Sequence, residues 1–349
     1  MKVRTMLCAI AFSTVMMQHA AGANDSVGVR QIMAPSKERG VNLDVTVWYS
    51  AQPGGETVLL GDNALFVGTP AMRDAPISSG KFPLILLSHG AGLAGNAQAL
   101  SWIAAPLAQQ GFVVAAPTHP GNSGRDRSAA ETMKLWLRPA DLTETLNAIE
   151  KDVYFKESLD QGKIGVLGLS MGGGTALAIA GARMDPKLIA GYCDTNVLNP
   201  SLCDWVKQSG VDLHSMNLQP AGRDNQDKRV GFAMAFDPAP SDIYEIKSFS
   251  RIAIPVDLIN LGQPGRIPLT AQASGIAKAI PNARYAVVED ASHFSMFGEC
   301  KPGAADIIKS EKIVDPLCTD GGGRSRNEIH TQLIDMATAA FSRALKTGP

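Results

Sequence analysis

The sequence predicts an α/β fold in which a mostly parallel β-sheet is covered by helices on both faces. Short apolar runs, which are typical of strands buried on both faces, alternate along the chain with longer segments of helical periodicity. Strand–helix alternation of this kind builds parallel sheets. The 349 residues are 45% hydrophobic, which is enough for a large core, and no stretch has the composition of a linker. We therefore expect a single domain over residues 24–349.

Seven segments are expected to be strands. Residues 43–47 alternate apolar and polar side chains, as a half-exposed strand does, and we extend this strand to Tyr49. The other six are runs rich in apolar residues at 82–87, 112–116, 164–167, 230–236, 252–261 and 284–288. The runs at 82–87, 112–116 and 164–167 are expected to be buried strands.

Four segments are expected to be helices. Residues 102–110 form a helix that ends before Gly111, and residues 139–149 form one with a proline in its first turn. Residues 175–183 are rich in small side chains, and residues 327–345 close the chain. The interval 192–228 does not follow the alternation, because it is polar and carries two cysteines. We interpret it as an insertion before the sixth core strand and as a candidate lid.

Charge and the N-terminus limit the class of protein. With 32 basic and 33 acidic residues, the chain has no basic excess with which to bind nucleic acid. Lys2 and Arg4, an apolar stretch over residues 6–17, and the small residues 21–23 are typical of a secretory signal peptide over residues 1–23. No later segment is long and apolar enough to span a membrane, so no stable membrane insertion is expected. The prediction is an exported protein, periplasmic or secreted.

The cysteines agree with export. Cys8 would leave with the signal peptide, and Cys193, Cys203, Cys300 and Cys318 would remain. Four cysteines in an oxidising compartment favour two disulfides, for which three connectivities exist. We expect Cys193 to pair with Cys203 and Cys300 with Cys318, because each pair brackets one loop-like segment. A zinc site is the competing interpretation, and it lacks the expected Cys-x-x-Cys spacing.

A Gly-x-Ser-x-Gly motif at residues 168–172 directly follows the expected strand 164–167 and leads into a helix. This strand–turn–helix context is the one in which Ser170 would act as a nucleophile. The turn is tight, so glycine is needed two positions before and two positions after the serine. An idle serine in a glycine-rich turn is the alternative. The motif refines the predicted class to an α/β-hydrolase fold.

The segment 88–92, Ser-His-Gly-Ala-Gly, ends the strand at 82–87. A His-Gly-x-Gly sequence at this place directs a backbone N–H toward the nucleophile. We expect the N–H groups of Ala91 and Met171 to form the oxyanion hole. An ordinary strand–helix turn is the alternative, because glycine is common in such turns.

The general base is expected to be His293, which follows the last core strand. A loop histidine at that position can fold back over Ser170 and accept its proton. The other five histidines lie in the signal segment, the two early strand-end loops, the insertion and the last helix, and are His19, His89, His119, His214 and His330.

A carboxylate that orients His293, the third member of a Ser-His-Asp triad, has no single obvious candidate in the sequence. Hydrolases of this architecture usually carry it after the strand at 252–261, but residues 262–266 contain no carboxylate, and Asp257 lies inside the strand. Asp237 follows the preceding strand and can also reach the histidine, which keeps the order Ser, Asp, His. A strand-terminal turn before proline is its alternative role. Asp194 is the second choice, and Glu289 and Asp290 stay open.

These residues resemble a known family. The segments 87–90, 107–111 and 112–119, together with Gly-Leu-Ser-Met-Gly, are similar to the plasma-type platelet-activating factor acetylhydrolases. They are closer still to the bacterial relatives often described as predicted dienelactone hydrolases. The resemblance extends from about residue 41 to the C-terminus. It implies an acid after the sixth strand, which matches Asp237, an oxyanion amide after His-Gly at Ala91, and the pair His293 and Phe294. Residues 192–228 look like the bacterial branch.

Two departures from the family limit what the resemblance implies. True dienelactone hydrolases use a cysteine nucleophile, whereas this chain has Ser170. The animal enzymes carry lipoprotein-docking surfaces for which we find no counterpart in this sequence.

The predicted function is an exported serine hydrolase that cleaves carboxylic esters with short acyl chains, acetyl-phospholipid-like substrates included. It needs no metal or organic cofactor, and its partner is a small-molecule ester. Trp102 and Phe294 are candidate pocket residues, with core packing as the alternative for each. An acyltransferase, amidase or lactonase with the same triad, or a non-catalytic binding module, are the alternative functions. The sequence leaves the oligomeric state open.

Overall fold

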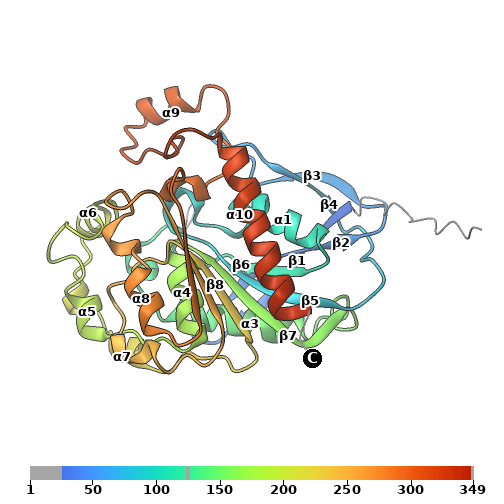
Figure 1. Ribbon diagram of the computed structural model, residues 1–349, viewed down its shortest axis with the longest axis horizontal. Coiled ribbons are helices and arrows are strands. Elements are labelled where there is room, and N and C mark those ends of the chain that lie inside the picture. Colours follow the sequence, from blue (N-terminus) through green and yellow to red (C-terminus); the bar gives the residue numbers. More distant parts are fainter. Residues whose placement is uncertain (1–25, 123–125, 347–349) are drawn as a thin grey trace, which may run out of the picture.

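The computed structural model describes residues 26–122 and 126–346. One sheet crosses the molecule in the strand order β10-β9-β8-β7-β5-β6-β2-β1-β4-β3 (Figure 1). The strands are β1 (Ser26–Ser36), β2 (Val41–Ala51), β3 (Glu56–Leu60), β4 (Thr69–Arg73), β5 (Phe82–Ser88), β6 (Val113–Pro117), β7 (Leu159–Leu169), β8 (Phe232–Phe236), β9 (Val256–Leu261) and β10 (Ala283–Val288).

Six strands, from β6 through β5, β7, β8 and β9 to β10, are mutually parallel, and β2 joins them antiparallel to β6. Every residue of β6, β8 and β9 is buried, which is why β6 and β8 are unbroken apolar runs in the sequence, whereas β9 also carries Asp257 and Asn260. The carboxyl ends of parallel strands meet at one edge of the sheet, where loops from β5, β7, β8 and β10 come together. The predicted fold class is confirmed.

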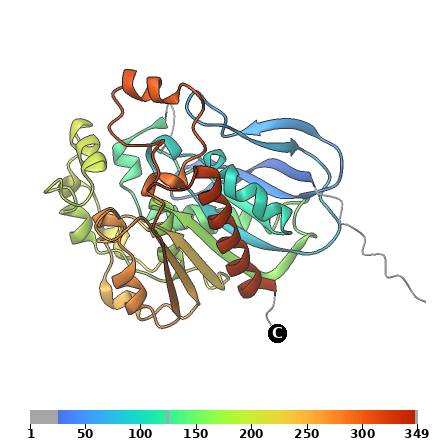
Figure 2. The same cartoon turned by 45° about the horizontal axis from the view of Figure 1, so that its top comes forward.

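Helices cover both faces of the sheet. On one face lie α1 (Ser101–Gln109) and α10 (Arg326–Phe341), which contact each other and pack on the core residues of that side (Figures 1 and 2). On the other lie α3 (Leu137–Ile149), α4 (Met171–Ala180) and α8 (Ser274–Ala279). The short helices are α2 (Ala129–Thr132), α5 (Pro186–Ala190), α6 (Pro200–Gln208), α7 (Ile246–Phe249) and α9 (Ala304–Ser310).

The structure differs from the sequence-based elements in several places. Strands β1, β3 and β4 were not expected; β1 lacks a clean alternation, and its pairing partner β2 holds it in the sheet through eleven residue pairs. Strand β9 begins at Val256, directly after Pro255, and not at residue 252. Helix α4 begins at Met171, four residues before the expected start, because the turn at Ser170 leads straight into it.

Two segments leave the layered fold and lie beyond the carboxyl edge of the sheet. Residues 192–228 contain α6 and no strand, and residues 297–325 contain α9, which rises above the body in Figures 1 and 2. Each is closed by a disulfide, Cys193 with Cys203 and Cys300 with Cys318, which are the two pairs expected from the sequence. The expected signal peptide at residues 1–23 lies outside the described residues.

Candidate active site

Ser170 occupies the sharp turn between β7 and α4. Its backbone has φ 54° and ψ −118°, a conformation that is costly for a residue with a side chain. A Cβ at Gly168 would lie 1.9 Å from the carbonyl oxygen of Gly172, and one at Gly172 would lie 1.9 Å from the carbonyl oxygen of Ser88. The two glycines of the motif are therefore required by backbone packing on either side of the serine.

Ser170, His293 and Asp237 form a continuous hydrogen-bonded chain. The Ser170 Oγ lies 3.1 Å from Nε2 of His293, and Nδ1 of His293 lies 2.9 Å from Oδ2 of Asp237. Because a carboxylate only accepts hydrogen bonds, Nδ1 carries the proton and Nε2 is free to accept that of the serine. The Asp237 side chain is fully buried, whereas that of His293 is 18% exposed. The three side chains come from the ends of β7 and β8 and from the loop after β10.

Asp237 is held by the neighbouring strand β9. Its Oδ1 accepts hydrogen bonds from the side-chain amide of Asn260 at 2.7 Å and from the backbone N–H of Leu261 at 2.8 Å. Asn260 is itself fixed, since its Oδ1 accepts from the N–H of Ala273 and from the hydroxyl of Tyr285. Asn260 could not be recognised from the sequence, because a lone amide inside a mostly apolar strand carries no local signal.

The loop with His293 is braced from the other side. His293 begins a 3-10 turn (His293–Met296) whose capping residue Ser292 exchanges hydrogen bonds with Ser295. Ser295 donates to Asp320 at 2.5 Å, and Ser292 donates to the carbonyl oxygen of Thr319 at 2.9 Å. The segment before α10 therefore fixes the backbone that presents the imidazole.

The residues expected to bind an oxyanion lie beside the serine. Ala91 lines the same cavity as Ser170, and a Cβ at Gly90 would lie 3.4 Å from the Cβ of Ser170. Met171 is the first residue of α4, and the first N–H groups of a helix have no partner within it. The positive end of the α4 dipole points to the same place. The amide of Ala91, in the loop after β5, and the amide of Met171, in the first turn of α4, therefore both lie next to Ser170.

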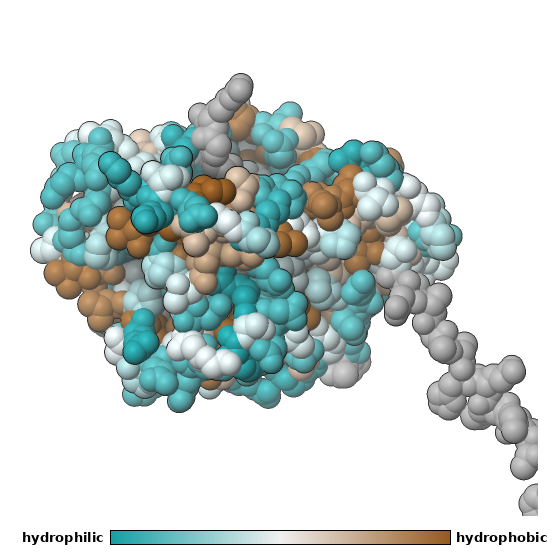
Figure 3. All heavy atoms as spheres, turned by 90° about the horizontal axis from the view of Figure 1, so that it is seen from above, coloured by the Kyte–Doolittle hydropathy of each residue, from teal (hydrophilic) through white to brown (hydrophobic). Residues whose placement is uncertain are grey.

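A cavity of about 360 Å³ opens onto Ser170 and His293. Its wall is mainly apolar and includes Phe294, Phe297, Leu202 and Trp205. The end of the molecule from which α9 projects carries apolar patches set among hydrophilic residues (Figure 3). A volume of this size suits a small organic ligand.

Trp102 does not line this cavity, so the prediction that it is a pocket residue is wrong. Its indole stacks on the ring of His330 with centroids 3.8 Å apart, and its Nε1 donates to the carbonyl oxygen of Met296. The cause is tertiary: α1 packs against α10, so the side chain at the start of α1 faces that helix. Phe294, the other candidate, does line the cavity.

The alternative acids are engaged elsewhere. Asp194 lies 2.8 Å from Nε2 of His214 in an exposed pair. Asp290 forms an ion pair with Arg324, and Asp257 forms one with Arg343. Of the carboxylates weighed from the sequence, Asp237 is the one that contacts His293.

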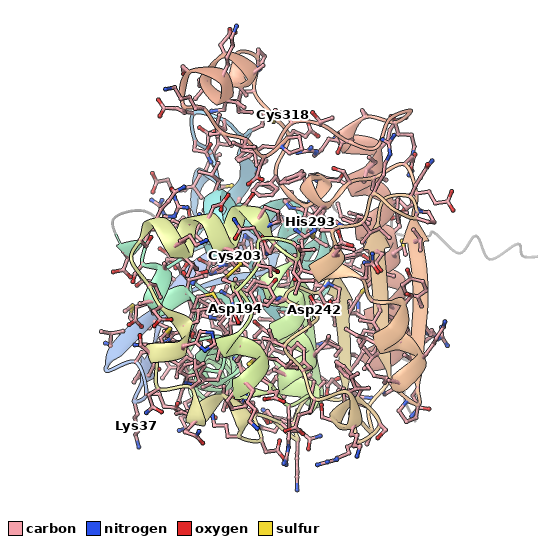
Figure 4. All side chains as sticks on the ribbon, turned by 90° about the vertical axis from the view of Figure 1, so that its left-hand side faces the viewer. Lys37, Asp194, Cys203, Asp242, His293 and Cys318 are labelled. Atoms are coloured by element: carbon pink, nitrogen blue, oxygen red, sulfur yellow. A yellow bond between two sulfur atoms is a disulfide. The ribbon has the colours of Figure 1, made fainter. Side chains whose placement is uncertain are left out.

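The two disulfide-closed segments meet over the cavity. Residues Leu198 to Leu202 at the start of α6 line it from one side, and Asp315 lines it from the other. The hydroxyl of Ser201 donates to Oδ1 of Asp315 at 2.7 Å and so joins the two segments. In the view of Figure 4, Cys318 lies above His293 and Cys203 lies beside it.

Within the described ranges, no three His, Cys, Asp or Glu side chains are grouped so that they could hold a metal ion. None of the helices in that part of the chain combines the length and the apolar character needed to cross a membrane.

The sheet order and the turn at Ser170 are those of the α/β-hydrolase fold, and solved structures with this fold align over most of the chain. A ferulic acid esterase from Streptomyces cinnamoneus superposes with a TM-score of 0.61 at 18% identity, over 94% of this chain and 92% of its own. A putative dienelactone hydrolase from Klebsiella pneumoniae gives a TM-score of 0.50 at 12% identity, over 91% of this chain and 100% of its own. At these identities the likeness shows the fold.

Sequence comparison confirms the more particular resemblance over part of the chain. Residues 57–152 match the family described as platelet-activating factor acetylhydrolase, isoform II. A platelet-activating factor acetylhydrolase from Canis lupus familiaris is 34% identical over 156 residues, an alignment that covers 32% of this chain. The alignment spans about a third, 35%, of that relative's length. The family match, residues 57–152, includes the loop with Ala91 and ends before Ser170.

Proposed function

We propose that this protein is a serine hydrolase of carboxylic esters that acts through an acyl-enzyme on Ser170. The observation that carries the proposal is the chain Ser170–His293–Asp237, with distances of 3.1 and 2.9 Å, at the wall of a mainly apolar cavity. The names of the relatives, an acetylhydrolase and a ferulic acid esterase, both denote the hydrolysis of ester bonds.

In the first half-reaction, Nε2 of His293 takes the proton of Ser170 as the serine oxygen attacks the ester carbonyl. Asp237 holds the imidazole in the tautomer that leaves Nε2 free and stabilises the imidazolium that forms. The imidazolium then gives its proton to the departing alcohol. The serine remains as an acyl ester.

The negative charge of the tetrahedral intermediate would be bound by the N–H groups of Ala91 and Met171. A single preorganised donor of this kind is worth on the order of 3 kcal/mol of the activation barrier. In the second half-reaction, water loses a proton to His293 and attacks the acyl-enzyme, which releases the acid and restores Ser170. These steps use only side-chain and backbone groups of this chain.

The cavity supports a substrate with a short acyl chain. About 360 Å³ has to hold the parts of the ester on either side of the reacting carbon, and the wall offers aromatic and aliphatic side chains to them. An acetyl ester, which the canine relative's name specifies for that protein, fits this volume. We further propose that the protein is exported, which the two disulfides and the signal-like N-terminus support.

The proposal is tested with residues 24–349 and p-nitrophenyl esters from acetate to dodecanoate. Wild type and Ser170→Ala are compared at equal concentration, with Asp194→Asn as a variant that alters an exposed carboxylate elsewhere. We expect turnover in wild type and Asp194→Asn, and none above background in Ser170→Ala. Equal background rates in all three proteins would refute an ester hydrolase, and labelling or binding assays with amides and lactones would follow.

A further inference from the structure

A second Ser-His-Asp chain lies buried behind the loop that carries Ala91. The hydroxyl of Ser88 lies 2.9 Å from Nε2 of His119, and Nδ1 of His119 lies 2.8 Å from Oδ2 of Asp141. All three side chains are fully buried and none lines the cavity, so no substrate reaches them. Arg39 holds the Asp141 carboxylate with two hydrogen bonds, at 3.1 and 2.8 Å.

A backbone group of this cluster determines which ring nitrogen of His89 carries the proton. The backbone N–H of His119 donates to Nε2 of His89 at 2.9 Å, so the proton of the neutral ring is on Nδ1. Burial lowers the pKa of His89 well below its ordinary value, which keeps the ring neutral. Nδ1 lies 2.6 Å from the carbonyl oxygen of Gly90 and donates to it.

That hydrogen bond sets the direction of the Ala91 N–H. The Gly90 carbonyl and the Ala91 N–H belong to one peptide group, and in a trans peptide they point in opposite directions. With the carbonyl held toward the buried His89, the N–H faces away from it. Ala91 lies on the cavity wall with Ser170, so this opposite side is the side of the nucleophile.

Arg138 joins this loop to the helix that follows the nucleophile. Its guanidinium is buried and donates to the carbonyl oxygen of His89 and to Oγ1 of Thr175 in α4, the latter at 3.0 Å. Thr175 in turn donates to the carbonyl oxygen of Met171 at 3.0 Å. Two further donations, to Oδ1 of Asn122 at 3.2 Å and to Oγ of Ser88 at 3.4 Å, hold the guanidinium in place.

We propose that Arg138 is a positioning residue of the oxyanion hole, which fixes the loop carrying Ala91, whose Gly90 carbonyl His89 holds, in register with the first turn of α4. The inference rests on the proposed function, because it concerns how that site is assembled. The planar guanidinium suits this task, since its donors have fixed directions and can bind the loop and the helix at once. A lysine offers a single nitrogen whose donors lack the fixed, spread geometry of the guanidinium.

A matched pair of threonines provides the test. Thr175 and Thr145 are both buried, and each donates its hydroxyl to the carbonyl four residues earlier in its helix, at 3.0 and 2.8 Å. Thr175 also accepts from Arg138. Thr175→Val and Thr145→Val therefore lose the same bond within the helix, but only Thr175→Val breaks the link to the guanidinium. Arg138→Lys is the third variant, and Thr175→Ser restores the hydroxyl.

The readouts are kcat and KM for p-nitrophenyl acetate, the inhibition constant of a trifluoromethyl ketone, and thermal unfolding. The ketone forms a tetrahedral adduct on the serine whose oxyanion needs the same two N–H groups. We expect Thr175→Val and Arg138→Lys to lower kcat by about 10-fold or more, with KM within about 3-fold. The ketone's inhibition constant should rise in parallel, and Thr145→Val and Thr175→Ser should stay close to wild type.

The outcomes separate the two proposals. A folded Thr175→Val that keeps the wild-type kcat and ketone affinity overturns the positioning role, as does an equal loss in Thr175→Val and Thr145→Val. If Arg138→Lys does not fold, Thr175→Val decides alone. A wild type without Ser170-dependent hydrolysis refutes the proposed function itself, and the positioning role with it.

Discussion

Asn260 donates its side-chain amide to Oδ1 of Asp237 at 2.7 Å, across the gap between the ends of two neighbouring strands. Asn260 lies near the end of β9, close to where hydrolases of this architecture usually carry the acid, whereas the acid proposed here, Asp237, directly follows β8. The amide leaves Oδ2 of Asp237 for His293 and keeps the carboxylate from turning. The hydrogen bond also gives the fully buried carboxylate of Asp237 a polar partner.

Asn260→Ala is expected to lower kcat by about 10-fold or more, because a hydrogen bond to a buried charged group contributes about 1.5–3 kcal/mol. The measurement is steady-state hydrolysis of p-nitrophenyl acetate. Tyr285→Phe is the matched control, since it removes a hydrogen bond to Asn260 without touching Asp237. Equal kinetics in Asn260→Ala and wild type would show that Asp237 does not need this amide.

Asp237→Asn should lower kcat by about 10⁴-fold while the protein stays folded, because the amide favours the wrong tautomer of His293. Circular dichroism and thermal unfolding check the fold, and ester hydrolysis measures the effect. Asp290→Asn, which breaks the ion pair with Arg324 and leaves Asp237 intact, should keep most of its activity. A larger loss in Asp290→Asn than in Asp237→Asn would contradict the assignment of the acid.

Trp205→Ala should change the substrate preference, whereas Trp102→Ala should change the stability of the fold. Trp205 lines the cavity, so its removal should shift the preferred acyl chain to greater length in a p-nitrophenyl ester series. Trp102 stacks on His330 outside the cavity, so its removal should lower the free energy of unfolding by about 3 kcal/mol or more and leave the preferred chain length unchanged. An unchanged preference in Trp205→Ala would place the acyl group elsewhere.

His330 should make the protein less stable in acid. Burial lowers its pKa from 6.5 to about 4, so between these values the unfolded chain takes up the proton and the folded chain does not. The free energy of unfolding should fall by about 3 kcal/mol from this group as the pH drops through that range. Its contribution is fully retained above about pH 6.5.

The variant His330→Gln keeps a donor for the carbonyl oxygen of Ser295 and does not titrate. Urea unfolding at pH 7 and pH 5 should show a smaller loss of stability in this variant than in wild type. The buried His89 and His119, whose pKa values are also lowered by burial, retain their share of the acid sensitivity in both proteins. Identical losses would show that His330 is not protected from protonation.

The disulfide between Cys193 and Cys203 should affect both stability and substrate binding. Replacing both cysteines by serine should lower the free energy of unfolding by about 2–3 kcal/mol, because the unfolded chain loses a constraint. Helix α6 contains Cys203 and lines the cavity, so KM should rise as well. The double replacement of Cys300 and Cys318 is the comparison, and no change in either quantity would contradict the prediction.

The sequence predicts the site where function is tied to a local pattern. The turn at Ser170 is encoded by glycines that backbone contacts demand at positions 168 and 172, and His293 is marked by its place after the last strand. Asp237 follows from its place after a buried strand. Each of these signals lies within a few residues of the group that it identifies.

The rest of the site depends on contacts between distant parts of the chain. The stacking of Trp102 on His330 and the hydrogen bond from Asn260 to Asp237 each join two helices or two strands far apart in the sequence. The cluster of Arg138, His89 and His119 is similar, because a buried arginine in a helix looks like a surface residue until its partners are known. Strand β1 was missed for the same reason, since pairing with β2 defines it more than its own pattern does.

Covalent labelling by a fluorophosphonate shows whether Ser170 is an activated nucleophile. Wild type, Ser170→Ala and His293→Gln are incubated with the reagent, and intact mass and peptide mapping locate the adduct. We expect one adduct per wild-type chain on Ser170, none on Ser170→Ala, and much slower labelling of His293→Gln. No labelling of the wild-type chain, or equal labelling rates in all three proteins, would contradict the role of Ser170 as the nucleophile.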